Sequence, residues 1–269
     1  MRAVRAARIA AGCVIPGELL LVLCLAAGVR PPGWATAAAE ALVLGTLLLE
    51  AWVLCALRRR TGSWRRAVRA VVPEPVRLLL LHELRAAASL GRWIVRRRHG
   101  VGPGDLAAGY TGPQTAMMYG LLFVSVVETV GLAVLIPWPA VHRVVLVLDV
   151  YTVLLVLALH AACVTRPHVL RADGSLRIRY GALFDLTVPP DAVASARVER
   201  RYPEGRLVTL SEDGVLDLIV GSQTTVTLEL NRPLDFRRPL GARASARTIR
   251  FHVDDPRALV TALRQPASP

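Results

Sequence analysis

Five ionisable side chains stand inside long runs of apolar residues, and their types could carry chemistry there. They are Glu18, Glu50, Glu128, Asp149 and His160. Ionisable groups at membrane depth are costly and usually face a bundle interior or a water-filled path. Carboxyls and an imidazole in such positions can pass protons or hold a cation. The same residues also fit a structural role, as protonated carboxyls that hydrogen-bond between helices.

Glu128 is the strongest candidate of this group. It shares a helical face with Gly120 and Gly131, and small residues let another helix approach closely. Asp149 and His160 are eleven residues apart, about three helical turns, so they share a face of one helix. Because another helix can approach closely at these glycines, association with a second copy of the chain is also possible.

Other chemistry finds no support in the motifs. The sequence holds no phosphate-binding glycine loop with its Lys, no G-x-S-x-G and no H-E-x-x-H. No Glu-x-x-His pair occurs in the apolar runs, as a di-metal carboxylate bundle would need. The four cysteines lie in apolar runs and fit buried thiols. We therefore predict no catalytic residue, no metal site and no cofactor.

Four apolar runs are long enough to cross a membrane, which takes ~20 residues. They cover residues 9–29, 34–57, 114–138 and 144–164. Short proline-bearing turns join them in pairs, so we expect two transmembrane helical hairpins, 1–57 and 114–164. A cleavable signal peptide is the alternative for the first run, but that run is longer than the usual apolar core and holds Glu18.

The positive charge is unevenly distributed along the chain. All 33 basic residues are arginine and the net charge is +13. Segment 58–113 is rich in arginine, whereas each hairpin turn carries one. The positive-inside rule therefore places segment 58–113 and both termini in the cytoplasm, in a multi-pass protein of the cell membrane. Aromatic residues make up only 5% and do not alternate with basic ones, so we expect no nucleic-acid partner.

Residues 76–95, within the basic cytoplasmic loop 58–113, have the periodicity of an amphipathic helix. Four arginines share one face: Arg77, Arg85, Arg92 and Arg96. Apolar residues fill the opposite face, which is typical of a helix at the membrane interface. We expect the four arginines to contact anionic lipid headgroups. Packing of this helix on the protein's own domain is the alternative.

After residue 164 the apolar runs become short and alternate with polar residues, as in half-buried strands. About seven strands are predicted between residues 169 and 253, with a Asp173-Gly174 turn in the first hairpin. A helix is predicted from Pro256, capped by Asp255. Antiparallel strands closed by one helix are the order of a pleckstrin-homology-like (PH-like) fold. The fold class is thus α+β: a four-helix transmembrane bundle, then a PH-like domain over 166–269 that we expect to fold alone.

Several runs in the last 150 residues or so also carry a family resemblance. They are RPH at 166–168, LRIRYG at 176–181, TVPPDAV at 187–193, TLELNRP at 227–233 and FHVDDP at 251–256. With them the chain resembles uncharacterised actinobacterial integral membrane proteins that carry a C-terminal bacterial PH-like domain. The resemblance implies architecture and membrane location, and no enzymatic activity or lipid specificity comes with it.

These features together predict a membrane-anchored interaction or scaffolding module without catalysis. Its domain 166–269 would bind an unidentified protein partner or anionic lipid. The alternative is a small transporter or ion-conducting subunit that uses the acids in the apolar runs, and an intramembrane enzyme is a weaker third hypothesis. A transporter needs its acids to converge on one polar cavity, whereas a scaffold does not.

Overall fold

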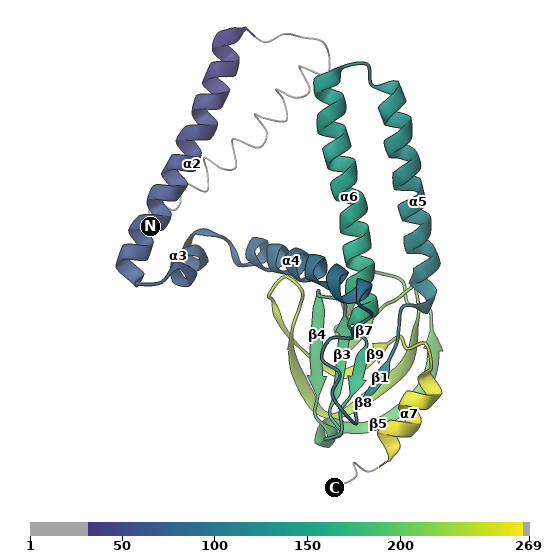
Figure 1. Cartoon of the computed structure of the whole chain (residues 1–269). Coiled ribbons are helices and arrows are strands. Elements are labelled where there is room, and N and C mark those ends of the chain that lie inside the picture. Colours follow the sequence, from purple (N-terminus) through teal and green to yellow (C-terminus); the bar gives the residue numbers. More distant parts are fainter. Residues whose placement is uncertain (1–31, 266–269) are drawn as a thin grey trace. The chain divides into compact units, whose positions relative to one another are not determined.

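The computed structural model describes residues 32–265, which form an α+β chain (Figure 1). Glu18 and the first apolar run lie outside these residues. The chain divides into two compact units, Met1–Arg77 with Thr129–Leu148 and Leu78–Glu128 with Asp149–Pro269. Each unit is described by itself.

In the first unit, α2 (Gly33–Thr61) covers the predicted run 34–57 and continues for one more turn. Its last turn holds three arginines, which interact favourably with the negative end of the helix dipole. Gly62 ends the helix in the left-handed conformation, where its N–H donates to the Arg58 carbonyl at 2.8 Å. The Arg58 guanidinium lies 4.6 Å from the ring centre of Trp64, the first residue of α3 (Trp64–Val71).

Two helices are long and apolar enough to cross a membrane. They are α5 (Gly112–Leu135) and α6 (Pro139–Thr165), and in the described part of the chain these two meet the length and composition required. They correspond to the predicted runs 114–138 and 144–164. Most of their apolar side chains are exposed.

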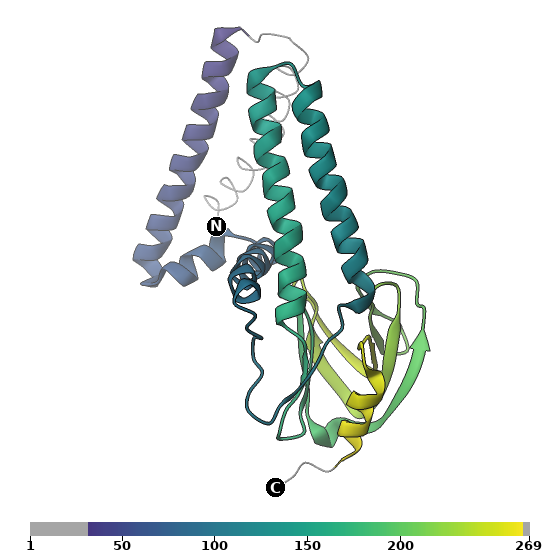
Figure 2. The same cartoon turned by 45° about the vertical axis from the view of Figure 1, so that its right-hand side comes forward.

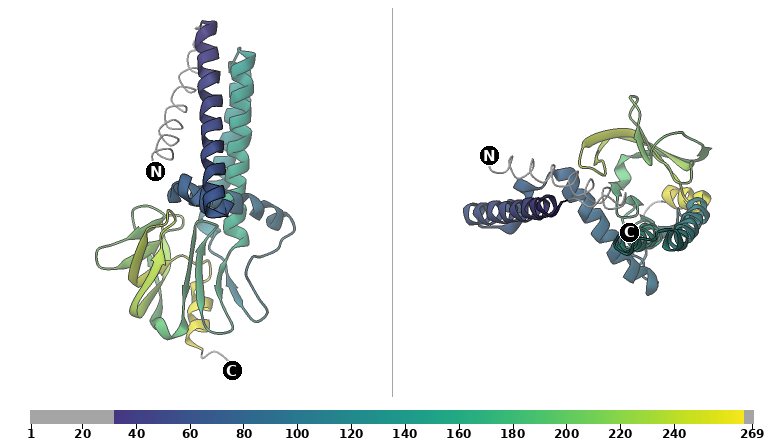
Figure 3. Two further views of the ribbon diagram at one scale, coloured as in Figure 1. Left: turned by 90° about the vertical axis from the view of Figure 1, so that its left-hand side faces the viewer. Right: turned by 90° about the horizontal axis from the view of Figure 1, so that it is seen from above.

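The helix predicted at 76–95 is α4 (Glu74–Ile94). In the second unit its residues from Leu78 onward lie across the C-terminal half of α6 (Figure 3). At this crossing Ala86 packs on Ala158 and Ala162. Alanines at this crossing let the two backbones approach closely.

A four-stranded sheet has the order β1-β2-β3-β4, and all its pairs are antiparallel. Its strands are β1 (Leu106–Ala108), β2 (His168–Leu170), β3 (Leu176–Tyr180) and β4 (Phe184–Val188). β1 comes from before α5 and the other three strands follow α6. The sheet therefore extends beyond the domain boundary predicted at residue 166.

A five-stranded sheet has the order β5-β8-β9-β7-β6. Its strands, preceded by the 3-10 turn η1 (Pro190–Ala192), are β5 (Val193–Arg201), β6 (Val208–Leu210), β7 (Val215–Leu218), β8 (Thr224–Arg237) and β9 (Arg243–Phe251). The prediction of purely antiparallel strands is wrong at one pair, because β7 and β9 run parallel. β8, with 14 residues, pairs along its length with β9, which enters the sheet between β8 and β7.

The two sheets lie face to face, and α7 (Pro256–Arg264) closes the layer between them (Figure 2). One apolar core joins both sheets to α7; its fully buried members include Leu176, Ile178, Leu216, Leu228, Ile249, Phe251 and Leu259. The predicted cap of α7 is confirmed, because the Asp255 carboxylate accepts a hydrogen bond from the Ala258 N–H at 3.1 Å. We call β1–β9 with α7 the β-domain.

Candidate functional site

The β-domain holds the start of α5 through Asp254. Its carboxylate Oδ1 accepts a hydrogen bond from the Gly112 N–H at 2.9 Å, and its own N–H donates to the Gly109 carbonyl at 2.8 Å. A Cβ on Gly112 would lie 2.7 Å from Oδ1, and one on Gly109 would lie 2.9 Å from Oδ2. Both positions therefore need glycine so that the carboxylate can cap the helix.

Tyr110, between those glycines, is completely buried. Its hydroxyl accepts a hydrogen bond from the Gly181 N–H at 2.7 Å, and its ring stacks on His168 at 4.6 Å between ring centres. Burial raises the pKa of Tyr110 well above its usual value, so the phenol stays neutral. Next to it, the Tyr180 hydroxyl donates to Gln114 on α5 at 2.9 Å. Buried residues of the sheet thus hold the loop that leads into α5 in place.

His168 is buried with both ring nitrogens bonded. Nδ1 accepts from the Arg179 N–H at 3.0 Å, and Nε2 lies 3.0 Å from the His252 carbonyl, which can only accept. These partners require the neutral ring with its proton on Nε2. Burial lowers the pKa of His168 to about 3, which agrees with that form.

Arg179 on β3 is only 1% exposed. Its Nε donates to the Pro167 carbonyl and its Nη1 to the His99 carbonyl, both at 2.9 Å, while its buried Nη2 has no partner. The neighbouring carboxylate of Asp185 is taken by two hydrogen bonds from Arg177. Burial, followed by the charge of Arg177, lowers the pKa of Arg179 to about 10. The charged guanidinium of Arg179 is therefore held by backbone carbonyls from the segments that follow α4 and α6.

The four predicted lipid-binding arginines lie in different surroundings. Arg85 and Arg92 on α4 lie near Arg166, which follows α6. Burial of Arg166 lowers its pKa most, and the positive charges of Arg92 and Arg85 lower it further. Arg77 lies 3.9 Å from Glu74 in a partly exposed ion pair. Arg96 follows α4 in the left-handed conformation, at φ 52°.

One face of α4 contacts the β-domain. The His82 ring lies between two backbone carbonyls, with Nδ1 2.7 Å from Ala182 O and Nε2 2.9 Å from Pro239 O. Because carbonyls only accept, a protonated ring nitrogen donates to the carbonyl that it faces. A separate face leaves apolar side chains uncovered: Leu84 is 67% and Ile94 75% exposed. The helix therefore packs on its own domain and also keeps an apolar face free.

The acids predicted in the apolar runs are not brought together in the described residues. Glu128 is exposed on α5, and a Cβ on Gly120 or Gly131 would meet nothing within 4 Å. Asp149 is half-buried on α6, and no hydrogen bond or ion pair joins it to Glu128 or His160 in this part of the chain. Glu50 lies on α2, where only its backbone is described.

His160 is buried near the crossing of α4 and α6. Its ring centre lies 5.9 Å from that of Trp93 and 5.3 Å from that of Tyr119, and its Nδ1 has no hydrogen-bond partner. Nearby on α6, the Tyr151 hydroxyl donates to the carboxylate of Glu83 on α4. Aromatic packing and one carboxylate bond therefore fasten α4 to α6.

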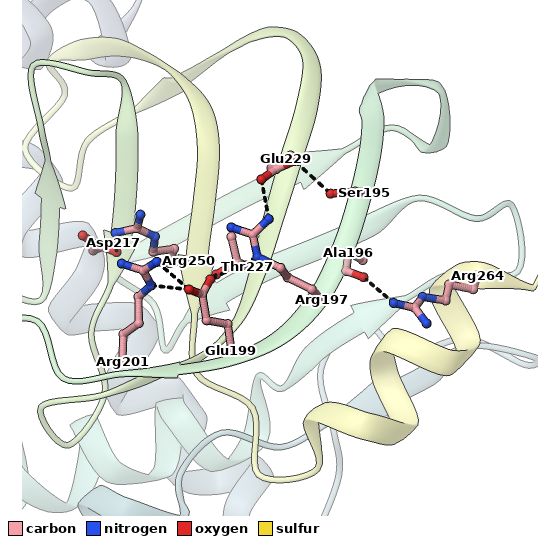
Figure 4. Close-up of polar contacts among 10 residues, drawn as sticks. All are labelled: Ser195, Ala196, Arg197, Glu199, Arg201, Asp217, Thr227, Glu229, Arg250 and Arg264. Atoms are coloured by element: carbon pink, nitrogen blue, oxygen red, sulfur yellow. Dashed lines mark hydrogen bonds and ion pairs between the residues drawn. The ribbon is translucent and has the colours of Figure 1, made fainter.

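The outer face of the five-stranded sheet carries a ladder of ion pairs (Figure 4). Arg197 bonds to Glu229 and Glu199, and Glu199 in turn accepts from Arg201 at 2.8 Å and from the Thr227 hydroxyl at 2.8 Å. The hydrogen bonds from Arg201 and then Thr227 lower the pKa of Glu199 to about 2. Each carboxylate of this ladder is therefore paired with an arginine.

No group of three or more His, Cys, Asp or Glu residues between 32 and 265 is placed to hold a metal ion. Four residues connect the β-domain to the segments next to α5 and α6: Tyr110, His168, Arg179 and Asp254. They were not singled out from the sequence. Arg177 and Arg179 alternate with Leu176 and Ile178, which indicates one apolar and one solvent-facing side of a strand. Segment 99–110 covers that second side, and only its glycine-flanked tyrosine hints at such a contact.

Comparisons of the chain with protein-family models, with curated proteins and with solved structures find no match.

Proposed function

We propose that this protein is a membrane-anchored binding module without catalytic activity. On this proposal α5 and α6 cross the membrane, together with α2 and the run at 9–29. The β-domain, which we infer to be PH-like, lies at the cytoplasmic face and presents its surface to a protein partner. The observation that carries the proposal is that both apolar helices end in buried contacts with the β-domain.

The two attachments are direct. Asp254 caps the first turn of α5, and a Cβ on Gly221 would lie only 2.5 Å from Pro113, so the turn before β8 also abuts this helix. α6 ends at Thr165, and β2 begins at His168 with no flexible linker between them. Short connections of this kind suit a module whose binding domain is attached directly to its membrane helices.

A transporter or ion-conducting subunit remains the second candidate. The observation in its favour is that Asp149 Oδ2 and His160 Nδ1 are enclosed without hydrogen-bond partners. Such atoms at membrane depth can mark a proton path. The exposed position of Glu128 and the lack of a bond between these groups favour the binding module.

Photo-crosslinking in cells tests the proposal. A benzophenone amino acid replaces Tyr202, which is 70% exposed, or Leu240, both on the β-domain, and Phe123 on α5 serves as the exposed control. We expect a discrete protein adduct from a β-domain position and none from Phe123. An adduct of twice the chain mass identifies a second copy as the partner.

The absence of an adduct at both β-domain positions contradicts the binding module. Proton flux in proteoliposomes that is lost in Asp149→Asn would then establish the conducting subunit instead.

A further inference from the structure

A cleft of about 490 Å³ lies between the end of α4 and the C-terminal end of α6. Both helix ends belong to the second unit of the chain. The lining separates into an apolar group and a cationic group: Trp93, Ile94 and Val164 in the first, and Arg96, Arg97 and Arg98 in the second. A cleft of this composition matches a ligand that has an anionic head and an apolar tail.

The backbone is strained where the arginines begin. The Arg96 N–H donates to the Trp93 carbonyl at 3.0 Å and the Arg97 N–H to the Arg92 carbonyl at 2.8 Å, which is the Schellman pattern of a helix end. Arg96 occupies the left-handed position, where glycine is usual and a side chain costs free energy. An arginine at that position indicates that its side chain serves a purpose there.

A second group of arginines lies behind the cleft, beyond the α6 terminus. The His99 N–H donates to the Thr165 carbonyl at 2.7 Å, and the His99 carbonyl accepts from the Arg179 Nη1. A Cβ on Gly100 would lie 3.1 Å from Arg179 Nη1 and 3.2 Å from Arg177 Nη1. Glycine at position 100 lets the backbone that follows the cleft arginines pass close to the guanidinium groups of Arg177 and Arg179.

Positive charge is therefore in excess around the end of α6. Asp185 is already bonded to Arg177, and Arg179 keeps a buried Nη2 without a partner. Arg179 does not line the cleft, but its charge adds to the positive potential around the cleft arginines, and that potential favours an anion bound to them. Phosphate oxygens match the fork of guanidinium donors better than a single carboxylate can match three of them.

We propose that this cleft binds one anionic phospholipid, with the headgroup phosphate on Arg96, Arg97 and Arg98 and the acyl chains along Trp93, Ile94 and Val164. The proposal rests on the proposed function only in placing the end of α6 at the membrane surface. The lipid would secure α4 and thereby the β-domain to which α4 is docked.

Native mass spectrometry of the full chain in detergent tests this site. The probes are dioctanoyl phosphatidylglycerol, dioctanoyl phosphatidylcholine and inorganic phosphate. We expect one phosphatidylglycerol to bind about tenfold more tightly than phosphatidylcholine, because the cleft adds charge attraction to apolar contact. Substituting Arg96, Arg97 and Arg98 together by Gln should weaken phosphatidylglycerol binding about tenfold.

The chain offers a matched control in a second run of three arginines at the end of α2, Arg58, Arg59 and Arg60. Their triple substitution by Gln removes the same charge and should leave the affinity within about twofold of wild type. Equal losses in the two triple variants would mean general charge attraction and overturn the site. Competition by inorganic phosphate, with binding unaffected by Ile94→Ser, would mean a small-anion site and overturn the lipid.

Arg96→Gly separates the site from folding. Glycine relieves the left-handed strain, so this variant should melt at a higher temperature and yet bind phosphatidylglycerol more weakly. A rise in melting temperature with unchanged lipid affinity would contradict the role of Arg96. Because the crosslinking experiment has its own readout, loss of the lipid site and loss of the binding module can be told apart.

Discussion

At the scale of single residues, His168 makes the stability of the β-domain depend on pH. Its pKa is about 3 in the folded protein and 6.5 when unperturbed. Between these two pH values His168 is protonated in the unfolded chain and neutral in the folded chain. The free energy of unfolding therefore decreases as the pH falls below 6.5, and this decrease levels off below about pH 3. At pH 5 the protonation of His168 in the unfolded chain lowers the free energy of unfolding by about 2 kcal/mol.

Thermal melting of the protein in detergent between pH 7.5 and 5 measures this effect. We expect the melting temperature of the wild type to fall by about 4–8 °C more than that of His168→Asn, which cannot take up a proton. Parallel curves for the two proteins would show that the proton uptake occurs elsewhere.

Asp254 makes a second prediction at this scale. Asp254→Ala removes the cap of α5 and should cost about 1 kcal/mol of stability. Asp254→Asn keeps the side-chain oxygen that accepts from Gly112 and should keep most of that stability. Denaturation midpoints of the two variants decide the matter, and an equal loss in both would assign the effect to charge rather than to the cap.

At the scale of elements, α4 has three faces with different partners. His82 and Ala86 face the β-domain and α6, Leu84 belongs to the uncovered apolar face, and Arg85 belongs to the cationic face. Docking through His82 fixes how the helix is rolled about its axis. This roll determines where the apolar and arginine faces point, so the docking face controls the other two.

His82→Ala should loosen α4, because the ring that lies between the Ala182 and Pro239 carbonyls and hydrogen-bonds to the β-domain is lost. We expect trypsin to cleave after Arg85 and Arg92 about tenfold faster, since an opening cost lower by 1.4 kcal/mol raises the open population tenfold. Leu84→Ala, on the uncovered face, is the control and should leave the cleavage rate unchanged. Fragment mass spectrometry follows both, and identical rates in the two variants would show that His82 does not hold the helix.

The elements that the sequence predicts well are those with a local pattern. Helical and strand periodicity place α4, α5, α6 and α7 and most strands within a few residues. Pro233 cannot donate to a strand ladder, and an irregularity in the pairing between Glu229 and Leu234 lets β8 continue past it. The parallel pair β7–β9 and the docking of β1 depend on contacts between distant segments, and no local pattern reports them.

The candidate site divides in the same way. Arg85, Arg92 and Arg96 follow from helical periodicity, whereas Arg166 and Arg179 join them only through the fold. His160 was found because a histidine in an apolar run is conspicuous, but its aromatic neighbours Trp93 and Tyr119 come from two other helices. A sequence can therefore show which side chains are unusual before it can show what surrounds them.

At the scale of the whole molecule, the arginine distribution predicts the orientation in the membrane. Reporter fusions at Gly33 and Ala140 should read as extracytoplasmic, and those at Gly104 and the C-terminus as cytoplasmic. Alkaline phosphatase and fluorescent-protein reporters give opposite signals on the two sides. An extracytoplasmic C-terminus would contradict the whole arrangement.

Strand β1 has a consequence for the order of synthesis. A ribosome makes residues 106–108 first, and their partner β2 appears only after all of α5 and α6 has been translated. On the proposed topology, both strands meet only if the intervening hairpin has entered the bilayer and returned. A hairpin inserted with one helix too few leaves β1 and β2 on opposite sides of the membrane, with unpaired strand edges and no pocket for Tyr110. Closure of the sheet would then report correct insertion, and misinserted chains would be left unfolded for proteases to remove.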